Sequence, residues 1–206
     1  MKESNNIKGV TGEDGSTKAR IERAAINLFA ERGVDAVTTR EIAAASGVSE
    51  GALYRHFPGK EELALTVFMA IHQKLAAKIR DATAHEGGRS ASIHDQARAV
   101  VRVYCQTADD DWPLFSYHLL TTHRYLPSPD LPQTSDQESP VAAVEELILS
   151  AMERGELPKG DAYLKAAMAL GVVLQAAVHI FYGRVSGVLS DHEDQLTAAV
   201  LAVLNS

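Results

Sequence analysis

The sequence is poor in cysteine, and its first 20 residues lack a hydrophobic stretch. It holds one cysteine, Cys105, among 206 residues, so neither a disulfide within the chain nor a zinc site made of cysteines alone can form. The first 20 residues are polar, so we expect no secretory signal and a cytoplasmic protein. The chain also lacks internal repeats and the alternation that is typical of β-strands.

Catalytic motifs are missing as well. The chain has no nucleophile elbow, no phosphate-binding glycine loop and no pair of metal ligands at helical spacing. His118 and His123 stand five residues apart, whereas a spacing of four would align two ligands on one helical face. We therefore expect no enzyme, no cofactor and no metal. An all-helical enzyme that uses these histidines is the alternative, and turnover of a small molecule would support it.

Composition and charge fit a soluble globular protein with an acidic body. Apolar residues make up 46% and charged residues 23% of the chain, which is ordinary for such proteins. The net charge of −7 opposes binding to nucleic acid, but it is unevenly distributed. Residues 1–60 hold nine Lys or Arg and eight Asp or Glu, whereas residues 61–206 hold eleven and nineteen. An N-terminal module could therefore still meet phosphates.

Apolar residues recur with the helical period along most of the chain. Ile21, Leu28 and Phe29, for example, share one face with two alanines between them. Nine helices are expected, and no strand. They lie at about residues 16–32, 38–46, 49–57, 60–85, from 92, 111–125, 140–154, 161–187 and 190–204.

Local signals mark several helix ends. Gly33 is a plausible C-cap, and Ser139 followed by Pro140 is a strong start signal. Ser190 and Glu193 have the spacing of a capping box, which predicts the start of the last helix. Two segments lack these patterns: residues 1–15 read as a mobile tail, and residues 127–140, with four prolines, as a loop.

One segment is long enough to raise the question of a membrane span. Residues 166–183 carry no formal charge, which meets the lower length limit for a transmembrane helix. The segment contains Gln175, His179 and five alanines and stands alone in an acidic chain. We therefore expect no membrane association, and instead a helix covered on one side by its own core and on another by a partner chain.

The stretch from Thr38 to Lys60 predicts a helix-turn-helix. Thr38 and Glu41 have capping-box spacing, Gly47 permits a tight turn, and Ser49 can cap the second helix. Leu53 points inward on that second helix. Two short helices joined by a glycine turn are typical of this motif.

The outer face of the second helix suits the major groove of DNA. Gly51 and Arg55 lie opposite Leu53 on a helical wheel, so small residues stand near the start of the exposed face and polar ones near its end. Small side chains let the backbone approach base edges, and hydroxyls and helix N-termini bind phosphates. The alternative is a three-helix head without a role in DNA binding.

At this point a family resemblance becomes specific. Over about residues 17–65 the chain resembles the N-terminal domain of TetR-family transcriptional regulators, whereas beyond residue 65 only the helical layout and length match. One departure is Gly59, which takes a place that is often an N-capping serine. The matching residues are Thr38, Thr39, Arg40, Glu41, Ile42, Ala43, Ser46, Gly47, Val48, Ser49, Gly51, Leu53, Tyr54, His56, Phe57, Lys60, Glu61 and Leu63.

The resemblance implies an all-α protein with a three-helix DNA-binding head and a six-helix ligand-binding and dimerisation domain. The expected divisions are a disordered tail at 1–15, the helix-turn-helix domain at 16–62 and the C-terminal domain at 63–206. The expected function is a sequence-specific transcriptional regulator, most often a repressor in this family. It would leave a palindromic operator when a small-molecule effector binds.

By the same resemblance, eleven residues would contact DNA. Glu50, Gly51, Ala52 and Arg55 would face bases, with Arg55 to guanine or Glu50 to cytosine as the natural polar contacts. Thr39 and Arg40 would contact the backbone, with a base edge as a further option. The phosphates would be held by Ser49, Tyr54, His56 and Lys60. The full set is Thr38, Thr39, Arg40, Ser49, Glu50, Gly51, Ala52, Tyr54, Arg55, His56 and Lys60.

Aromatic and polar residues of the C-terminal part suggest an effector cavity between helices, although each would also serve as ordinary core. Cys105 reads as a buried thiol, with a redox sensor as the alternative. The candidate effector residues are Tyr104, Trp112, Phe115, His118, Gln175, His179 and Tyr182.

Two apolar helices near the C-terminus predict a homodimer. Small and large residues alternate on the helix at 161–187, and two helices from each chain would form a four-helix interface. The dimer would place two reading helices about 34 Å apart on a palindrome. The candidate interface residues are Leu170, Gly171, Leu174, Val178, Phe181, Leu196, Ala199, Val200 and Val203.

The predicted mechanism is a population shift. The effector would favour a conformation whose heads do not fit adjacent major grooves, with the helix at 60–85 as the connecting lever. A DNA-binding architectural protein without an effector is the alternative, and a core without cavities would favour it.

Overall fold

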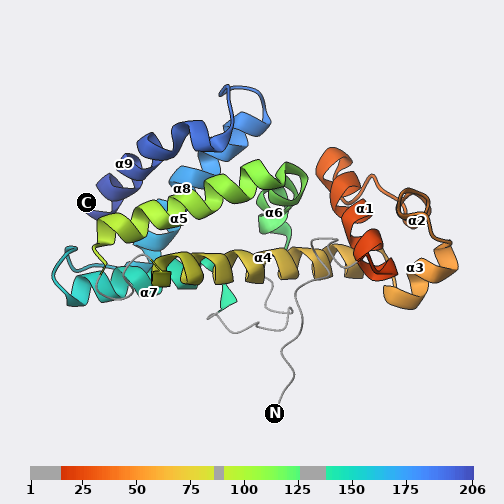
Figure 1. Cartoon of the computed structure of the whole chain (residues 1–206), viewed down its shortest axis with the longest axis horizontal. Helices are drawn as coiled ribbons and strands as arrows, with labels where there is room; N and C mark the ends of the chain where they lie inside the picture. Colours follow the sequence, from red (N-terminus) through yellow and green to blue (C-terminus); the bar gives the residue numbers. More distant parts are fainter. Residues whose placement is uncertain (1–14, 86–90, 126–137) are drawn as a thin grey trace, which may run out of the picture. The chain divides into compact units, whose positions relative to one another are not determined.

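The computed structural model describes residues 15–85, 91–125 and 138–206. These residues form nine α-helices and one short 3₁₀ turn, η4, and contain no strand, which confirms the all-α prediction (Figure 1). The predicted tail and most of the predicted proline-rich loop lie outside the described residues. The elements are α1 (Thr17–Arg32), α2 (Thr39–Ser46), α3 (Glu50–His56), α4 (Lys60–His85), α5 (Ile93–Asp110), α6 (Trp112–Tyr125), α7 (Pro140–Glu153), α8 (Ala162–Phe181), η4 (Leu189–His192) and α9 (Glu193–Leu204).

Hydroxyl side chains start most of the helices, as the sequence predicted. Ser92 Oγ accepts a hydrogen bond from the amide of Asp95 at the start of α5. Ser139 does the same for Ala142 at the start of α7, where Pro140 is the first helical residue. These caps satisfy amides that have no partner within the helix.

Two predicted boundaries near the C-terminus are wrong. α8 ends at Phe181 rather than near Gly187, because Gly183 takes a left-handed conformation at φ 65° and its amide turns back to the carbonyl of Ile180. The last helix begins at Glu193 rather than Ser190. η4 occupies the intervening residues, and the Asp191 carboxylate accepts a hydrogen bond from the Val188 amide, so the expected Ser190 cap does not form.

The chain folds into two compact units. One comprises the described residues of Met1–Ile71 and Pro113–Pro127, and the other those of His72–Trp112 and Ser128–Ser206. The break therefore falls inside α4, and α6 belongs to the first unit. This division rests on packing, and the functional division at residues 62 and 63 stays a prediction.

The first unit has its core where α1, α4 and α6 meet. The Tyr117 hydroxyl, which is buried, donates a hydrogen bond of 2.7 Å to the carbonyl of Ala64 on α4. The ring of Tyr117 lies 5.7 Å from that of Phe29 on α1. On the other side of the core, the ring of His118 stacks on Phe68 at 4.9 Å. A helix distant in sequence thus completes the core of the N-terminal helices.

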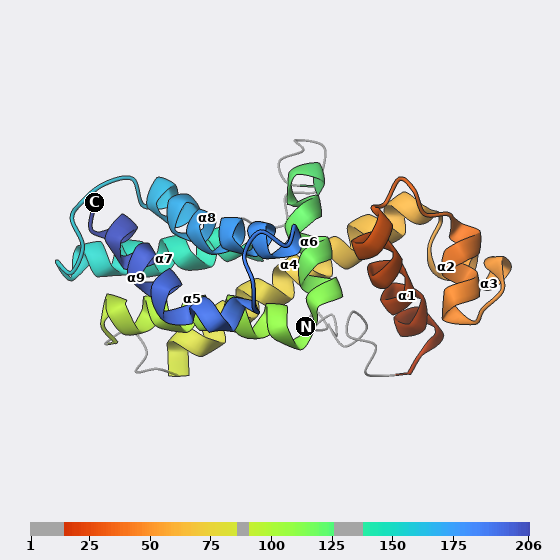
Figure 2. The same cartoon turned by 90° about the horizontal axis from the view of Figure 1, so that it is seen from above.

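The second unit is a helical bundle. In it α7 packs on α8, α8 on α9, and α9 on α5, an arrangement that can be followed in Figure 2. Cys105 is fully buried on α5, and burial raises the pKa of its thiol to about 12.

α8 is the one described helix that is long and apolar enough to cross a membrane, by length and composition only. A single such helix is weak support for a span, because core and interface helices of soluble proteins share this composition.

Candidate nucleic-acid interface

The first helix of the predicted helix-turn-helix, α2, begins with a complete capping box. The Thr38 hydroxyl accepts a hydrogen bond from the Glu41 amide, and the Glu41 carboxylate accepts one from the Thr38 amide at 2.8 Å. Arg32 donates to the same carboxylate at 2.8 Å. The hydrogen bonds from Thr38, with a smaller contribution from Arg32, lower the pKa of Glu41 to about 2. The carboxylate therefore stays charged and holds the start of α2 in place.

The turn between α2 and α3 depends on a glycine and on an arginine from α1. Gly47 has φ 66°, the left-handed region that glycine adopts without strain. Arg20 donates hydrogen bonds from its Nη2 to the carbonyls of Ser46, at 2.5 Å, and of Gly47, at 3.0 Å. The guanidinium thus caps the C-terminal end of α2. Sequence reasoning missed Arg20, since 26 residues separate it from Ser46 and no local spacing links the two.

The second helix, α3, has one buried side chain and an open outer face. Leu53 is fully buried, whereas Glu50, Gly51 and Arg55 are exposed. A Cβ atom added to Gly51 would meet only the Ser49 Oγ, at 4.0 Å. Nothing within the chain therefore requires glycine there, and its missing side chain leaves room for a close approach from outside.

All eleven predicted DNA-contacting residues are accessible in the structure. Thr39, Ala52 and Lys60 are half-buried, and the other eight are exposed. The structure brings two of the eleven into contact, because the hydroxyls of Thr39 and Tyr54 lie 3.2 Å apart. Lys60 donates from its Nζ to the carbonyl of Asp35 at 3.2 Å.

An ion-pair cluster that the sequence did not reveal borders this interface. Arg124, on α6, donates two parallel hydrogen bonds of 3.0 Å to the two carboxylate oxygens of Asp35. Its Nη2 also donates to Glu61 on α4 at 3.0 Å. The hydrogen bonds between Arg124 and Asp35 lower the pKa of Asp35 below its usual value and raise that of Arg124. Residues so far apart in sequence could not have been connected by any motif.

The seven predicted effector residues are divided between the two units. Phe115 and His118 are buried in the first unit, whereas the other five belong to the second. Of those five, Gln175 and Tyr182 are exposed, and none of the seven lines the groove or the apolar void described in the next paragraph. Tyr104, Phe115 and His118 are buried, and Trp112 and His179 are half-buried. No three His, Cys, Asp or Glu side chains among the described residues are placed to hold a metal ion.

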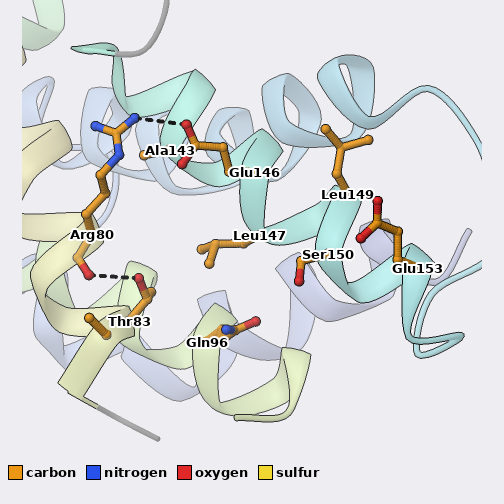
Figure 3. A pocket seen from close by; sticks show the side chains of 10 residues that line it. Arg80, Thr83, Gln96, Ala143, Glu146, Leu147, Leu149, Ser150 and Glu153 are labelled. Atoms are coloured by element: carbon orange, nitrogen blue, oxygen red, sulfur yellow. Dashed lines mark hydrogen bonds and ion pairs between the residues drawn. The ribbon is translucent and has the colours of Figure 1, made fainter. Parts of the chain in front are cut away.

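A different set of residues in the second unit lines a groove of about 540 Å³ between α4, α5 and α7. An ion pair between Arg80 and Glu146, at 3.3 Å, closes one end, and Leu147 points into the space between these helices (Figure 3). Leu147 also borders a second void of about 20 Å³ whose lining is entirely apolar. Sequence reasoning missed the groove because its lining combines charged and apolar residues that read as ordinary helix surface. The ten lining residues are Arg80, Thr83, Ala84, Gln96, Ala143, Glu146, Leu147, Leu149, Ser150 and Glu153.

The predicted dimer residues divide by burial. Leu170, Leu196 and Val200 are at most 7% exposed within the single chain and leave little surface for a partner. Gly171 and Ala199 are exposed, and Leu174, Val178, Phe181 and Val203 are half-buried. The exposed side of α8 also carries large apolar residues outside the predicted set, namely Tyr163, Leu164 and Met168.

Comparison with known proteins finds a sequence match over the N-terminal helices. Residues 21–67 match the family model of bacterial regulatory proteins of the tetR family. The HTH-type transcriptional repressor KstR2 of Mycobacterium tuberculosis is 38% identical over 72 residues, which are 35% of this chain and 36% of that protein. The match thus spans about a third of the length of these relatives.

Solved structures extend the similarity to the whole fold. A TetR family transcription regulator from Marinobacter aquaeolei superposes with a TM-score of 0.75 over 93% of this chain and 97% of its own, at 19% identity. The transcriptional regulator FadR from Bacillus subtilis, in complex with stearoyl-CoA, has a TM-score of 0.68 at 18% identity and covers 89% of this chain and 97% of its own. This chain thus shares its fold with these solved structures, and its N-terminal helices match the tetR family model over residues 21–67.

Proposed function

We propose that the first unit binds double-stranded DNA by placing α3 in the major groove. The observation that carries this proposal is the face of α3 opposite Leu53, on which Gly51 and Arg55 are exposed. A seven-residue helix held by one buried leucine has its remaining surface free for base edges. Arg55 is suited to a bidentate contact with guanine, worth about 1–3 kcal/mol of discrimination.

The backbone contacts would come from the helix starts around α3. Thr38 and Ser49 place hydroxyls at the N-termini of α2 and α3, where amides attract phosphates. Tyr54 can donate to a phosphate oxygen, with Thr39 beside it. Lys60, at the start of α4, adds a positive charge.

Repression through a dimer is the proposed mode of action. The curated relative with the matching head is a transcriptional repressor. The exposed apolar side of α8, around Leu164, Met168 and Gly171, is suited to a two-fold interface with a second copy. Such a dimer would read two half-sites of a palindrome about 34 Å apart.

A small amphipathic effector is the proposed signal. The groove of about 540 Å³ has the size of a ligand site. Its polar end, at Arg80 and Glu146, and its apolar wall at Leu147 suit a molecule with a polar group and an apolar portion. The FadR complex with stearoyl-CoA shows this fold holding an amphipathic ligand. The groove also favours this proposal over an architectural protein without an effector.

Selection from a random duplex library tests DNA binding. Wild-type protein should enrich a palindromic sequence, and Arg55→Ala should weaken binding to it by about 5- to 150-fold, the loss of one bidentate base contact. Arg98→Ala is the matched control, because Arg98 is an exposed arginine of α5, paired with Asp194 in the second unit. Failure to enrich any sequence at low salt would refute the proposal.

Two further variants test the dimer and the effector groove. Gly171→Arg should leave a folded monomer, since nothing lies within 4 Å of an added Cβ atom there, and sedimentation velocity would detect it. For the groove, ligands from a panel of fatty acids, acyl-CoAs and uncharged amphiphiles should raise the melting temperature of wild-type protein. Leu147→Trp should abolish this effect, whereas Leu120→Trp, at an exposed position of α6, should not.

A further inference from the structure

Arg124 connects the two residues that flank the helix-turn-helix in sequence. Asp35 lies three residues before Thr38, the N-cap of α2, and Glu61 lies in the first turn of α4, just after the motif ends. Arg124 donates to both carboxylates, with three contacts of 3.0 Å. The start and the end of the motif are thus joined through one guanidinium.

The hydrogen bonds of Arg124 fix the orientation of the bonded groups as well as the distance between them. Two parallel hydrogen bonds from a planar guanidinium to one carboxylate fix the orientation of both groups. A lysine at this position would offer a single point charge without that orientation. Lys60 adds a fourth contact by donating to the backbone carbonyl of Asp35 at 3.2 Å. The side chain and the backbone of Asp35 are therefore both held.

Arg124 lies on a part of α6 that is packed against α4. Its neighbour Tyr125 is buried, with its ring 5.0 Å from that of Phe68 on α4. About two turns earlier on α6, Tyr117 donates to the carbonyl of Ala64. The guanidinium therefore extends from a rigid part of the first unit toward the two ends of the motif.

The cluster contributes little to the stability of the fold. The side chains of Arg124, Asp35 and Glu61 are 38%, 81% and 61% exposed. Ion pairs in such positions are screened by water and salt and are worth about 0–1 kcal/mol. The cluster has a specific geometry but adds little to the free energy of unfolding. We therefore expect it to have a role other than stabilising the fold.

We infer that Arg124 is a positioning residue for DNA reading: it fixes the orientation of the helix-turn-helix by tying Asp35 and Glu61 to α6. This inference rests on the proposed DNA binding. Contacts to base edges require close geometry, whereas attraction to phosphates acts over a longer range. Loss of the cluster should therefore reduce sequence discrimination more than it reduces binding to DNA in general.

Hydrogen exchange without DNA tests the structural half of the inference. In full-length Arg124→Ala, amides of α2 and α3 should exchange about fivefold faster than in wild type, because an opening restrained by a surface ion-pair network becomes easier. Exchange in α8 and the melting temperature should match those of Arg98→Ala, which breaks an exposed pair in the second unit. Exchange in α2 and α3 equal to that of the control, or acceleration spread over the second unit as well, would overturn the inference.

Binding assays with the duplex that wild-type protein selects test the functional half. The ratio of affinities for the selected and a scrambled duplex should fall about tenfold in Arg124→Ala, as if one base contact were weakened. Arg124→Lys should recover only part of it. Asp35→Asn with Glu61→Gln should cause the same loss, and adding Arg124→Ala to this pair should cause no more. Equal ratios in wild type and Arg124→Ala would overturn the inference. If wild type prefers no duplex, the proposed DNA binding fails, and the exchange experiment still decides whether Arg124 holds the motif.

Discussion

Replacing Leu53 with alanine should detach α3 from the first unit. Leu53 is 0% exposed and is the one buried residue among the seven of α3. Truncation of a fully buried leucine costs 2–5 kcal/mol, depending on how far the surroundings collapse. Because α3 is short and can settle inward, we expect a loss of about 3 kcal/mol in the free energy of unfolding of this unit.

Urea denaturation followed by far-UV circular dichroism measures this loss. Arg55→Ala, on the opposite and exposed face of α3, is the control and should change the free energy of unfolding by about 0.5 kcal/mol or less. Leu53→Met should retain most of the stability, because it conserves volume. A loss below about 1 kcal/mol in Leu53→Ala would mean that other contacts hold α3, and it would refute the argument that its outer face is free.

Three other predictions follow from local geometry. Gly47→Ala should destabilise the protein by about 1–2 kcal/mol, because Gly47 is in the left-handed region and the new Cβ atom would lie 3.0 Å from an Arg20 nitrogen. Gly59→Ala should be close to neutral in the same urea denaturation assay, because nothing lies within 4 Å of the added Cβ atom. Burial lowers the pKa of His72 from 6.5 to about 4. As the pH falls, the unfolded chain therefore takes up the proton before the folded one does. The free energy of unfolding should decline as the pH falls from 6.5 toward 4. His72→Phe should remove this decline. Identical pH profiles of stability in wild type and His72→Phe would contradict the prediction. Cys105, buried with a thiol pKa raised to about 12, should react with thiol reagents in urea but not in the native protein.

Local signals in the sequence predicted most of the helices, because caps and apolar periodicity act within a few residues. Thr38 and Ser139 begin helices as expected, and Gly33 ends one. The end of α8 was missed because two glycines, Gly183 and Gly187, both permit a left-handed turn, and both have positive φ in the structure. The sequence does not show which of them is the first to break the helix.

The residues around the helix-turn-helix show where sequence reasoning stops. The exposed face of α3 follows from the position of Leu53 on a helical wheel, since one turn of helix settles it. Arg20 and Arg124 act across 26 and 89 residues of chain, and only tertiary packing brings them to Ser46 and Asp35. The effector residues stay a prediction, because the sequence does not show which aromatic side chains and histidines fill a core and which line a cavity.

The packing of α6 against α1 and α4 bears on how the protein is synthesised. The segment that matches the family model ends at residue 67, but Tyr117 and His118 supply part of the core that this segment needs. A nascent chain that has just left the ribosome with its first 70 residues would still expose Phe29 and Phe68 to water. The core of the first unit can be completed only after residue 125 has emerged, so a fragment cut after the helix-turn-helix is expected to be less stable than the intact chain.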